Sequence, residues 1–179
     1  MKDTGAVYGE ALYGLAREEG LSRVILWQLH VLRRSFAAEP GFLRLLSAPN
    51  LPRVERCQIL EDCFRGQVDV YVLNFLKILT EKGHLRHFPR CVRVYENCYN
   101  RDHGILMVTA VTAAPLKNHQ KRALITKLQT IMGKQIVLEN VPDPGILGGI
   151  RLEYDGKRVE DTVAHRLEAI GNQLKLTQL

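Results

Sequence analysis

Residues 143–174 read DPGILGGIRLEYDGKRVEDTVAHRLEAIGNQL, and this stretch contains three periodicities in a row. Three apolar residues alternate with charged ones, namely Ile150, Leu152 and Tyr154. This two-residue period is typical of a β-strand with one buried face. Asp155 and Gly156 follow, and both tolerate the positive φ angles of a two-residue hairpin loop. The sequence therefore predicts a hairpin whose return strand covers residues 157–160.

The hairpin is flanked by a glycine pair and by a helical pattern. Gly148 and Gly149 stand directly before the first strand, where a side chain would block a turn or a close backbone approach. After the hairpin, Asp161 or Thr162 can cap a helix. The apolar residues of that helix recur at steps of three and four: Val163, Leu167, Ile170 and Leu174.

Upstream of this stretch the pattern is also mixed. Residues 105–113 are rich in β-branched residues and are expected to form a strand that ends before Pro115. Residues 117–132 are expected to form a helix, and residues 135–141 alternate again as a strand. The expected helix has one apolar face, made of Leu124, Ile125, Leu128 and Ile131. We expect a small α/β domain over residues 104–179.

The first 103 residues contain little strand pattern and predict an all-α six-helix bundle. The first stripe consists of Tyr8, Ala11, Leu12, Leu15 and Ala16, and core packing is as good an explanation for Tyr8 and Ala11 as exposure. On the fifth helix Ile78 lies off the expected core stripe. The only tryptophan, Trp27, is expected on the second helix close to the helical core. Overall, we predict an α+β protein.

The composition is that of a soluble globular protein. The chain has 179 residues, of which 46% are hydrophobic and 25% charged. No apolar run approaches the roughly 20 residues that span a bilayer, and we expect no signal peptide. The net charge of +6 invites a nucleic-acid hypothesis. The basic residues do not form one block, however, and the pairs Arg33-Arg34 and Lys121-Arg122 favour solvated faces.

No pattern in the sequence predicts catalysis, a cofactor or a metal. The four cysteines lack metal-ligand spacing and are expected to be reduced packing residues: Cys57, Cys63, Cys91 and Cys98. The glycine cluster at residues 145–149 lacks the lysine of a phosphate-binding loop. The motifs of serine hydrolases and of zinc metalloproteases are also missing from the sequence.

One nucleic-acid alternative depends on the same glycine cluster. Residues 145–148 fit the Gly-x-x-Gly of a KH loop, which clamps the backbone of single-stranded RNA. Such loops usually carry a basic or polar residue between the glycines. Here the two residues are Ile146 and Leu147, which offer no charge to a phosphate. A KH-like RNA-binding module is therefore the alternative hypothesis, and no nucleic-acid partner is expected.

The 143–174 stretch resembles the C-terminal signature of the delta subunit of bacterial F-type ATP synthase, a family related to the mitochondrial oligomycin-sensitivity-conferring protein. The matching residues are Asp143, Gly148, Gly149, Asp155, Gly156, Glu160, Thr162, Val163, Arg166 and Leu167. Glu160 and Asp161 stand where the family usually has Asp and Gly. The resemblance extends over nearly the whole chain through residues 8–12, 47–49, 81–85 and 108–116. Gly9 and His84 depart from the family's usual Ala and Arg.

The resemblance implies a non-catalytic stator component that links the catalytic head to the peripheral stalk. It implies that the helical domain binds the N-terminal helices of the alpha subunits, in a groove between the first and fifth helices. The matching positions are Tyr8, Ala11 and Ile78. It further implies that the C-terminal domain binds the C-terminal part of the b subunits. The expected location is the cytoplasmic face of a bacterial plasma membrane, with membrane association only through the complex.

Overall fold

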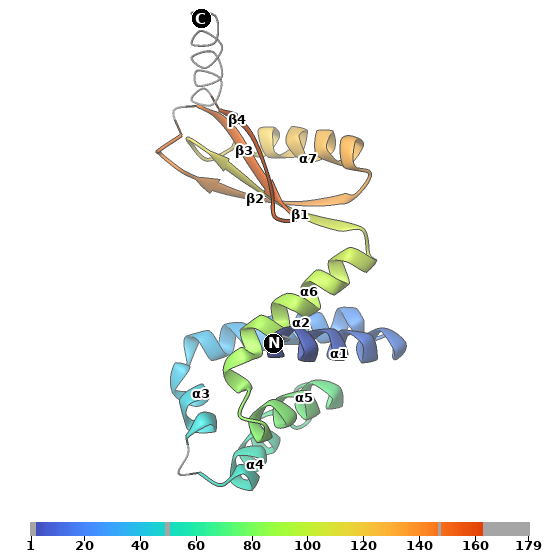
Figure 1. Ribbon diagram of the computed structural model, residues 1–179, viewed down its shortest axis with the longest axis vertical. Coiled ribbons are helices and arrows are strands. Elements are labelled where there is room, and N and C mark those ends of the chain that lie inside the picture. The colour runs from blue at the N-terminus through green and yellow to red at the C-terminus, as the bar shows by residue number, and fades with distance from the viewer. Residues whose placement is uncertain (1–2, 49–50, 147, 163–179) are drawn as a thin grey trace, which may run out of the picture. The chain divides into compact units, whose positions relative to one another are not determined.

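The computed structural model describes residues 3–48, 51–146 and 148–162, and it has an α+β fold (Figure 1). The chain divides into two compact units, Met1–Asn100 and Arg101–Leu179. The dividing point falls in the last turn of helix α6. Among the described residues, the first unit is helical and the second contains a four-stranded sheet with one helix.

Six α-helices and one short 3-10 helix make up the described part of the first unit. They are α1 (Thr4–Glu18), α2 (Ser22–Ala38), α3 (Pro40–Ser47), α4 (Arg53–Phe64), α5 (Val70–Glu81), η1 (Leu85–His87) and α6 (Phe88–Asp102). Asp3 and Asp69 cap α1 and α5, because their carboxylates accept the N–H groups of Gly5 and Tyr71. Pro89 falls in the first turn of α6, where a proline is tolerated.

The interior of the first unit is a single apolar cluster that draws on every helix. Its largest fully buried side chains include Tyr95, Phe88 and Leu76. The Tyr95 hydroxyl donates a hydrogen bond of 2.9 Å to the carbonyl of Ser22, which ties α6 to the start of α2. Burial raises the pKa of Tyr95, so this hydroxyl stays a donor at any physiological pH.

Two expectations about side chains of the first unit are wrong. Trp27 lies on α2, as expected, but its side chain is 64% exposed rather than close to the core. Leu15 belongs to the expected core stripe of α1, yet it is 39% exposed. Only Leu12 and Ala16 of that stripe are buried, together with Tyr13. The apolar stripe of α1 is therefore wider than the surface that the other helices cover.

Helix α1 and helix α6 approach closely at Gly9. A Cβ atom added to Gly9 would lie 2.6 Å from the carbonyl oxygen of Cys91 and 2.9 Å from Cβ of Val94. Real Cβ atoms do not come this close to backbone atoms, so either α1 or α6 would have to shift. Glycine at this position, where the family usually has alanine, lets the two backbones pack at this distance.

The second unit is a mixed sheet with the strand order β2-β1-β3-β4. Its elements are β1 (Ile105–Thr112), α7 (Asn118–Met132), β2 (Gln135–Pro142), β3 (Gly149–Tyr154) and β4 (Lys157–Thr162). Strands β1 and β2 are parallel and are connected through α7, whereas β3 pairs antiparallel with both β1 and β4. Helix α7 packs its apolar face against one side of this sheet.

The helix–sheet core is small, and its composition differs from the expectation at one residue. Leu124, Ile125 and Leu128 pack against the sheet, as expected. Ile131 does not, because its side chain is 69% exposed. Met132 packs against the sheet instead. Met132 lies one full turn beyond Leu128, whereas Ile131 falls on the flank of that stripe.

The hairpin has the geometry of a two-residue loop with positive φ at both positions. Asp155 has φ 45° and Gly156 has φ 72°, and the flanking Tyr154 and Lys157 are paired. Gly149 opens β3 at φ 92°, which favours glycine. Strand β4 is longer than expected and includes Asp161 and Thr162, the predicted helix caps. The predicted helix over 163–174 lies outside the described residues.

Candidate partner-binding site

The three residues predicted to bind a partner lie on two neighbouring helices of the first unit. Ala11 on α1 is exposed, and Ile78 on α5 is 44% exposed. Tyr8 is half-buried and packs partly against the core. On each helix the adjacent residue, Leu12 or Leu79, is buried instead. The structure therefore leaves apolar atoms of all three predicted residues accessible to a partner.

Two contacts show that α1 and α5 run antiparallel. Tyr71, at the start of α5, hydrogen-bonds Glu19, at the end of α1, and desolvation together with this carboxylate raises the pKa of Tyr71. At the other end, the rings of Tyr8 and His84 are 5.9 Å apart, and His84 follows α5. Ala11 on α1 and Ile78 on α5 therefore both lie between these two contacts along the helix pair.

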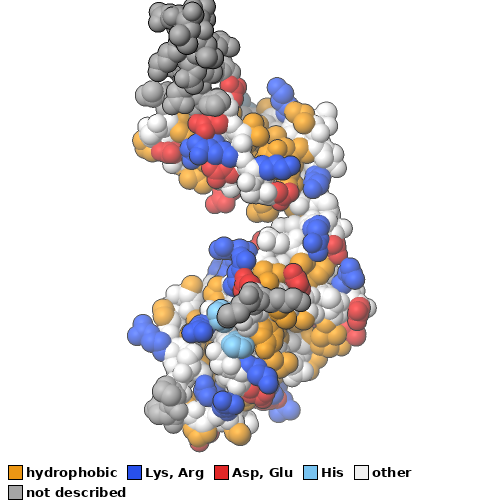
Figure 2. Space-filling view, in the orientation of Figure 1, with side chains coloured by type: hydrophobic (Ala, Val, Ile, Leu, Met, Phe, Trp, Pro, Cys, Tyr) orange, Lys and Arg blue, Asp and Glu red, His pale blue; other side chains and the backbone are white. Residues whose placement is uncertain are grey.

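Sequence reasoning missed two further exposed apolar residues on α1. Leu15 and Val7 are 39% and 46% exposed. Tyr8, Ala11 and Leu15 follow steps of three and four, so they form one stripe along the helix. We call Tyr8, Ala11, Leu15 and Ile78 the α1–α5 surface. Figure 2 shows hydrophobic side chains exposed over α1, with charged side chains around them.

His84 closes one end of the α1–α5 surface. Its ring centroid lies 5.9 Å from that of Tyr8 and 5.9 Å from that of His87. The Nδ1 atom of His84 is buried and has no hydrogen-bond partner among the described residues. The family's usual arginine would place a fixed charge here, whereas histidine places a ring that packs on Tyr8.

The start of α1 is fixed by charge as well as by packing. Arg90 on α6 forms an ion pair of 2.9 Å with Asp3, the residue that caps α1. This hydrogen bond from Arg90 lowers the pKa of the Asp3 carboxyl, so the carboxyl is ionised and accepts the cap hydrogen bond near neutral pH. The stripe of α1 is therefore held in a defined orientation from its first turn.

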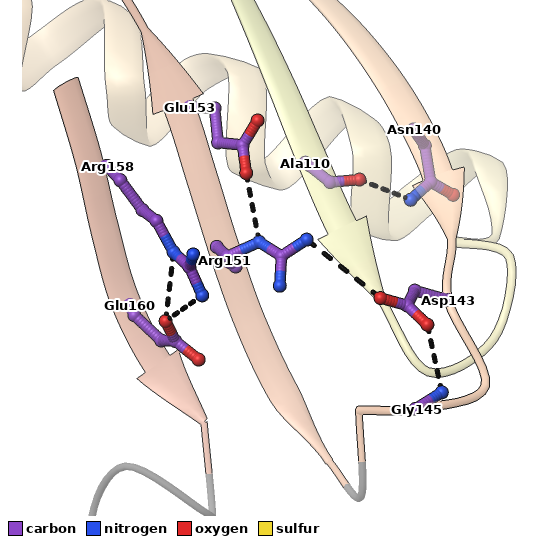
Figure 3. Close-up of polar contacts among 8 residues, drawn as sticks. All are labelled: Ala110, Asn140, Asp143, Gly145, Arg151, Glu153, Arg158 and Glu160. Carbon is purple, nitrogen blue, oxygen red and sulfur yellow. Dashed lines mark hydrogen bonds and ion pairs between the residues drawn. The ribbon is translucent and has the colours of Figure 1, made fainter. Parts of the chain in front are cut away.

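The second unit offers a different kind of surface, on the side of the sheet that faces away from α7. Apolar side chains are exposed there at Met107, Val137 and Val141. Beside them, ion pairs follow the strands: Arg151 with Glu153 at 3.0 Å and with Asp143 at 3.9 Å, and Arg158 with Glu160 at 2.6 Å (Figure 3). Apolar atoms thus adjoin charge pairs that neutralise one another.

The side chain of Asn140, on β2, connects this strand to β1 and to the loop that follows β1. The Asn140 amide donates a hydrogen bond of 2.9 Å to the Ala110 carbonyl (Figure 3). It donates a second one, also of 2.9 Å, to the Thr112 hydroxyl. Its Oδ1 atom accepts the N–H of Leu116 at 2.7 Å. Asn140 therefore fixes the loop that leaves β1 against β2, next to the turn that precedes β3.

The glycine cluster does not have the features of a phosphate clamp. Ile146 is buried, with 7% of its surface exposed. The N–H of Gly145, a donor that a clamp would offer to a phosphate, is bonded to the carboxylate of Asp143 at 2.9 Å (Figure 3). An acidic side chain that occupies this donor disfavours a phosphate at the same place. The loop is a turn that enters β3.

The described part of the chain can also be checked for a metal site and for a membrane-spanning helix. Within it, no three His, Cys, Asp or Glu side chains are grouped as a metal would need. Residues 3–48, 51–146 and 148–162 include no helix that is both long and apolar enough to cross a bilayer. The cysteines differ in burial: Cys63 is exposed, whereas Cys91 and Cys98 are buried.

The chain is similar to known proteins over nearly its full length. Residues 5–174 match the family model described as ATP synthase delta (OSCP) subunit. The chain is 31% identical over 167 residues to an ATP synthase subunit delta of Alkaliphilus oremlandii, with 93% of each chain covered. It is 29% identical over 171 residues to the Enterococcus faecalis ATP synthase subunit delta, with 95% and 94% covered.

A solved structure supports the fold independently. A chain in the cryo-EM structure of the Toxoplasma gondii mitochondrial ATP synthase hexamer matches with a TM-score of 0.73 and 20% identity. The match covers 97% of this chain and 98% of that one. At this identity the likeness concerns the fold, and it includes both the helical unit and the sheet unit.

Proposed function

The chain belongs to the ATP synthase delta (OSCP) subunit family, and from this membership we propose that it is a non-catalytic stator component of an F-type ATP synthase. In this role it links the catalytic head to the peripheral stalk. The observation that carries the proposal is the family match over residues 5–174, and the exposed α1–α5 surface adds a place where a partner can bind. The RNA-binding alternative has no support in the site's geometry.

The head is held, in this proposal, through the N-terminal helices of the alpha subunits. An amphipathic partner helix would lay its apolar stripe over Tyr8, Ala11 and Leu15 on α1 and over Ile78 on α5. Helix-in-groove recognition of this kind buries apolar residues of the partner at steps of three and four. Two antiparallel helices fixed at both ends supply a preorganised surface, which reduces the entropy lost on binding.

The peripheral stalk is held through the second unit. We infer that the C-terminal part of the b subunits binds there, and that the sheet side carrying Met107, Val137 and Val141 contributes to this contact. The neighbouring Arg151 and Arg158 are already paired with carboxylates, so a partner helix would meet mostly apolar atoms and neutralised charges. The chain would then be peripheral to the membrane, on its cytoplasmic face, and reach it only through the complex.

The mechanism that follows is mechanical. The rotor exerts torque on the head, and the stator must prevent the head from turning with it. This requires slow dissociation under load and a stiff connection, and it requires no chemistry in this subunit. If the connection is absent, the head can still hydrolyse ATP, but its hydrolysis no longer drives proton transport.

The proposed site can be tested with a synthetic peptide of the N-terminus of the alpha subunit from the same organism. Isothermal calorimetry with the full chain should show saturable binding at about one peptide per chain. Replacing an apolar contact by a charge, as in Ile78→Glu or Ala11→Asp, should weaken binding by at least about tenfold, which corresponds to about 1.4 kcal/mol.

Ile131→Glu is the matched control, because Ile131 is also an exposed helical isoleucine but lies on α7. This variant should bind the peptide as the unchanged protein does. Circular dichroism should show that all three variants keep their helix content. Equal loss of binding in Ile131→Glu, or unchanged binding in Ile78→Glu and Ala11→Asp, would contradict the proposed surface.

A further inference from the structure

A second groove of the helical unit lies between α2 and α6, away from the residues of the α1–α5 surface. It has a volume of about 490 Å³ and is open to solvent along its length. Its lining from α2 consists of Arg23, Leu26, Trp27, His30, Arg33 and Arg34, and Glu96 and Tyr99 line it from α6. The residues of α2 recur at steps of three and four, so they form one face of the helix.

The charge of this groove is mainly positive and is not neutralised from within. Arg23, Arg33 and Arg34 form no ion pair with any described residue. The one carboxylate in the lining, Glu96, lies 3.6 Å from Nε2 of His30. Three guanidinium groups are therefore available on about three turns of one helix, over roughly 16 Å.

Trp27 adds an apolar centre to the basic face. Its side chain is 64% exposed, although a tryptophan is normally well buried. Along α2 it is flanked by Arg23 one turn before and by Arg34 two turns after. Tryptophan and arginine, together with tyrosine, are the residue types enriched among the residues that dominate protein–protein binding energy.

From this arrangement we propose that the α2–α6 groove binds an acidic amphipathic helix of a partner protein. Acidic residues on successive turns of such a helix would pair with Arg23, Arg33 and Arg34, while an apolar residue between them would cover Trp27 and Leu26. The groove is too open to enclose a small molecule, which normally has most of its surface buried in its site. This inference rests on the groove alone and not on the proposed function.

The lining favours a peptide over a polyanion. A phosphate backbone that followed the groove would meet the Glu96 carboxylate, whereas a helix can place an uncharged residue there. Single-stranded nucleic acids usually bind along several stacked aromatic side chains, and Trp27 is the only strongly exposed aromatic residue of the groove. A lipid surface would require a broader exposed apolar face than one tryptophan supplies.

Trp27 is also the chain's only tryptophan, so its fluorescence reports on this groove directly. The probe is a synthetic acidic peptide of about four helical turns, with glutamates and leucines on adjoining faces. Its titration into the full chain should shift Trp27 emission to shorter wavelength and saturate. The same peptide with lysine in place of every glutamate should produce no saturable shift.

Variants then locate the binding. The double change Arg23→Glu with Arg34→Glu should lower the affinity for the acidic peptide by at least about tenfold, because like charges then face each other. Arg44→Glu on α3 is the matched control and should leave the affinity unchanged. Trp27→Ala is a second variant, and it adds no charge to α2. Its affinity for the acidic peptide, measured by calorimetry, should also fall. Ile78→Glu should bind this peptide normally, which separates the result from a test of the α1–α5 surface.

Other outcomes would overturn the proposal. These are equal binding of the lysine peptide, an affinity unaffected by both the arginine double variant and Trp27→Ala, or no saturable binding of the acidic peptide. A Trp27 shift produced only by oligouridylate would assign the groove to nucleic acid. A shift produced only by phosphatidylserine vesicles would assign it to a lipid surface.

Discussion

The two units of this protein are stabilised in different ways. The helical unit has an extensive apolar interior to which every helix contributes, and it retains exposed apolar residues on several helices, including α1, α2 and α5. The sheet unit has a small core of Leu106, Val108, Leu128 and Ile136, and polar groups such as Asn140 connect its strands and loops. Packing should therefore determine the stability of the first unit, and hydrogen bonds should matter more in the second.

The largest expected effect comes from removing a packed side chain of the helical unit. Leu76 is fully buried, and Leu76→Ala should lower the free energy of unfolding by about 2–5 kcal/mol. Leu128→Ala, in the smaller core, should fall near the lower end of the same range. Chemical denaturation followed by circular dichroism measures both. A larger loss of stability for Leu128→Ala than for Leu76→Ala would contradict the view that packing matters more in the helical unit.

The next effect tests whether close helix packing depends on glycine. Gly9→Ala should destabilise the first unit by about 1–3 kcal/mol, because its Cβ would meet the backbone of α6. Gly14 lies on the same helix and has no atom within 4 Å of an added Cβ. Gly14→Ala should therefore stabilise α1 by about 0.5–1 kcal/mol. Effects of the same sign in these two variants would contradict the role assigned to Gly9.

In the sheet unit, Asn140→Ala should lower the free energy of unfolding by about 1–3 kcal/mol, because it leaves the partners of three hydrogen bonds unpaired. Gln129→Ala, at an exposed position of α7, serves as the control and should change stability little. Hydrogen exchange should show faster exchange at the N–H of Leu116 in the Asn140 variant. Unchanged protection there would mean that the loop after β1 is held by other contacts.

The smallest effect concerns cysteine reactivity in the helical unit. Burial raises the pKa of Cys91 to about 11, so at pH 8 only roughly one thiol in a thousand is ionised. Because the thiolate is the reactive form, Cys91 should react with thiol reagents only when the unit opens. Exposed Cys63 should react at once. Mass spectrometry after timed labelling distinguishes them, and early modification of Cys91 would show that the helical interior is not closed.

The sequence predicted local features better than it predicted exposure. The alternation before Asp155 and Gly156 predicts a hairpin, and the hairpin is present because both the strand period and the turn chemistry are local. Ile78 could be placed off the core stripe of its helix for the same reason. Leu15 and Trp27 could not be placed, because their exposure depends on which neighbouring helices cover them.

Two other features could not be predicted from the sequence, for related reasons. The importance of Gly9 arises from the distance between α1 and α6, which no local pattern encodes. The basic groove could not be predicted either, because Arg33 and Arg34 by themselves indicate only a solvated pair. Its character depends on Trp27 and Arg23 on the same face of α2 and on the position of Glu96 on another helix.

If this chain transmits torque without chemistry, its removal should separate ATP hydrolysis from proton transport, and a coupling assay measures both. Inverted membrane vesicles from the organism that makes the chain would be depleted of it and assayed for ATP hydrolysis and proton pumping. Hydrolysis should persist while pumping is lost, and the unchanged chain, but not Ile78→Glu, should restore pumping. Proton pumping that continues in its absence would show that this chain is not the connection that holds the head.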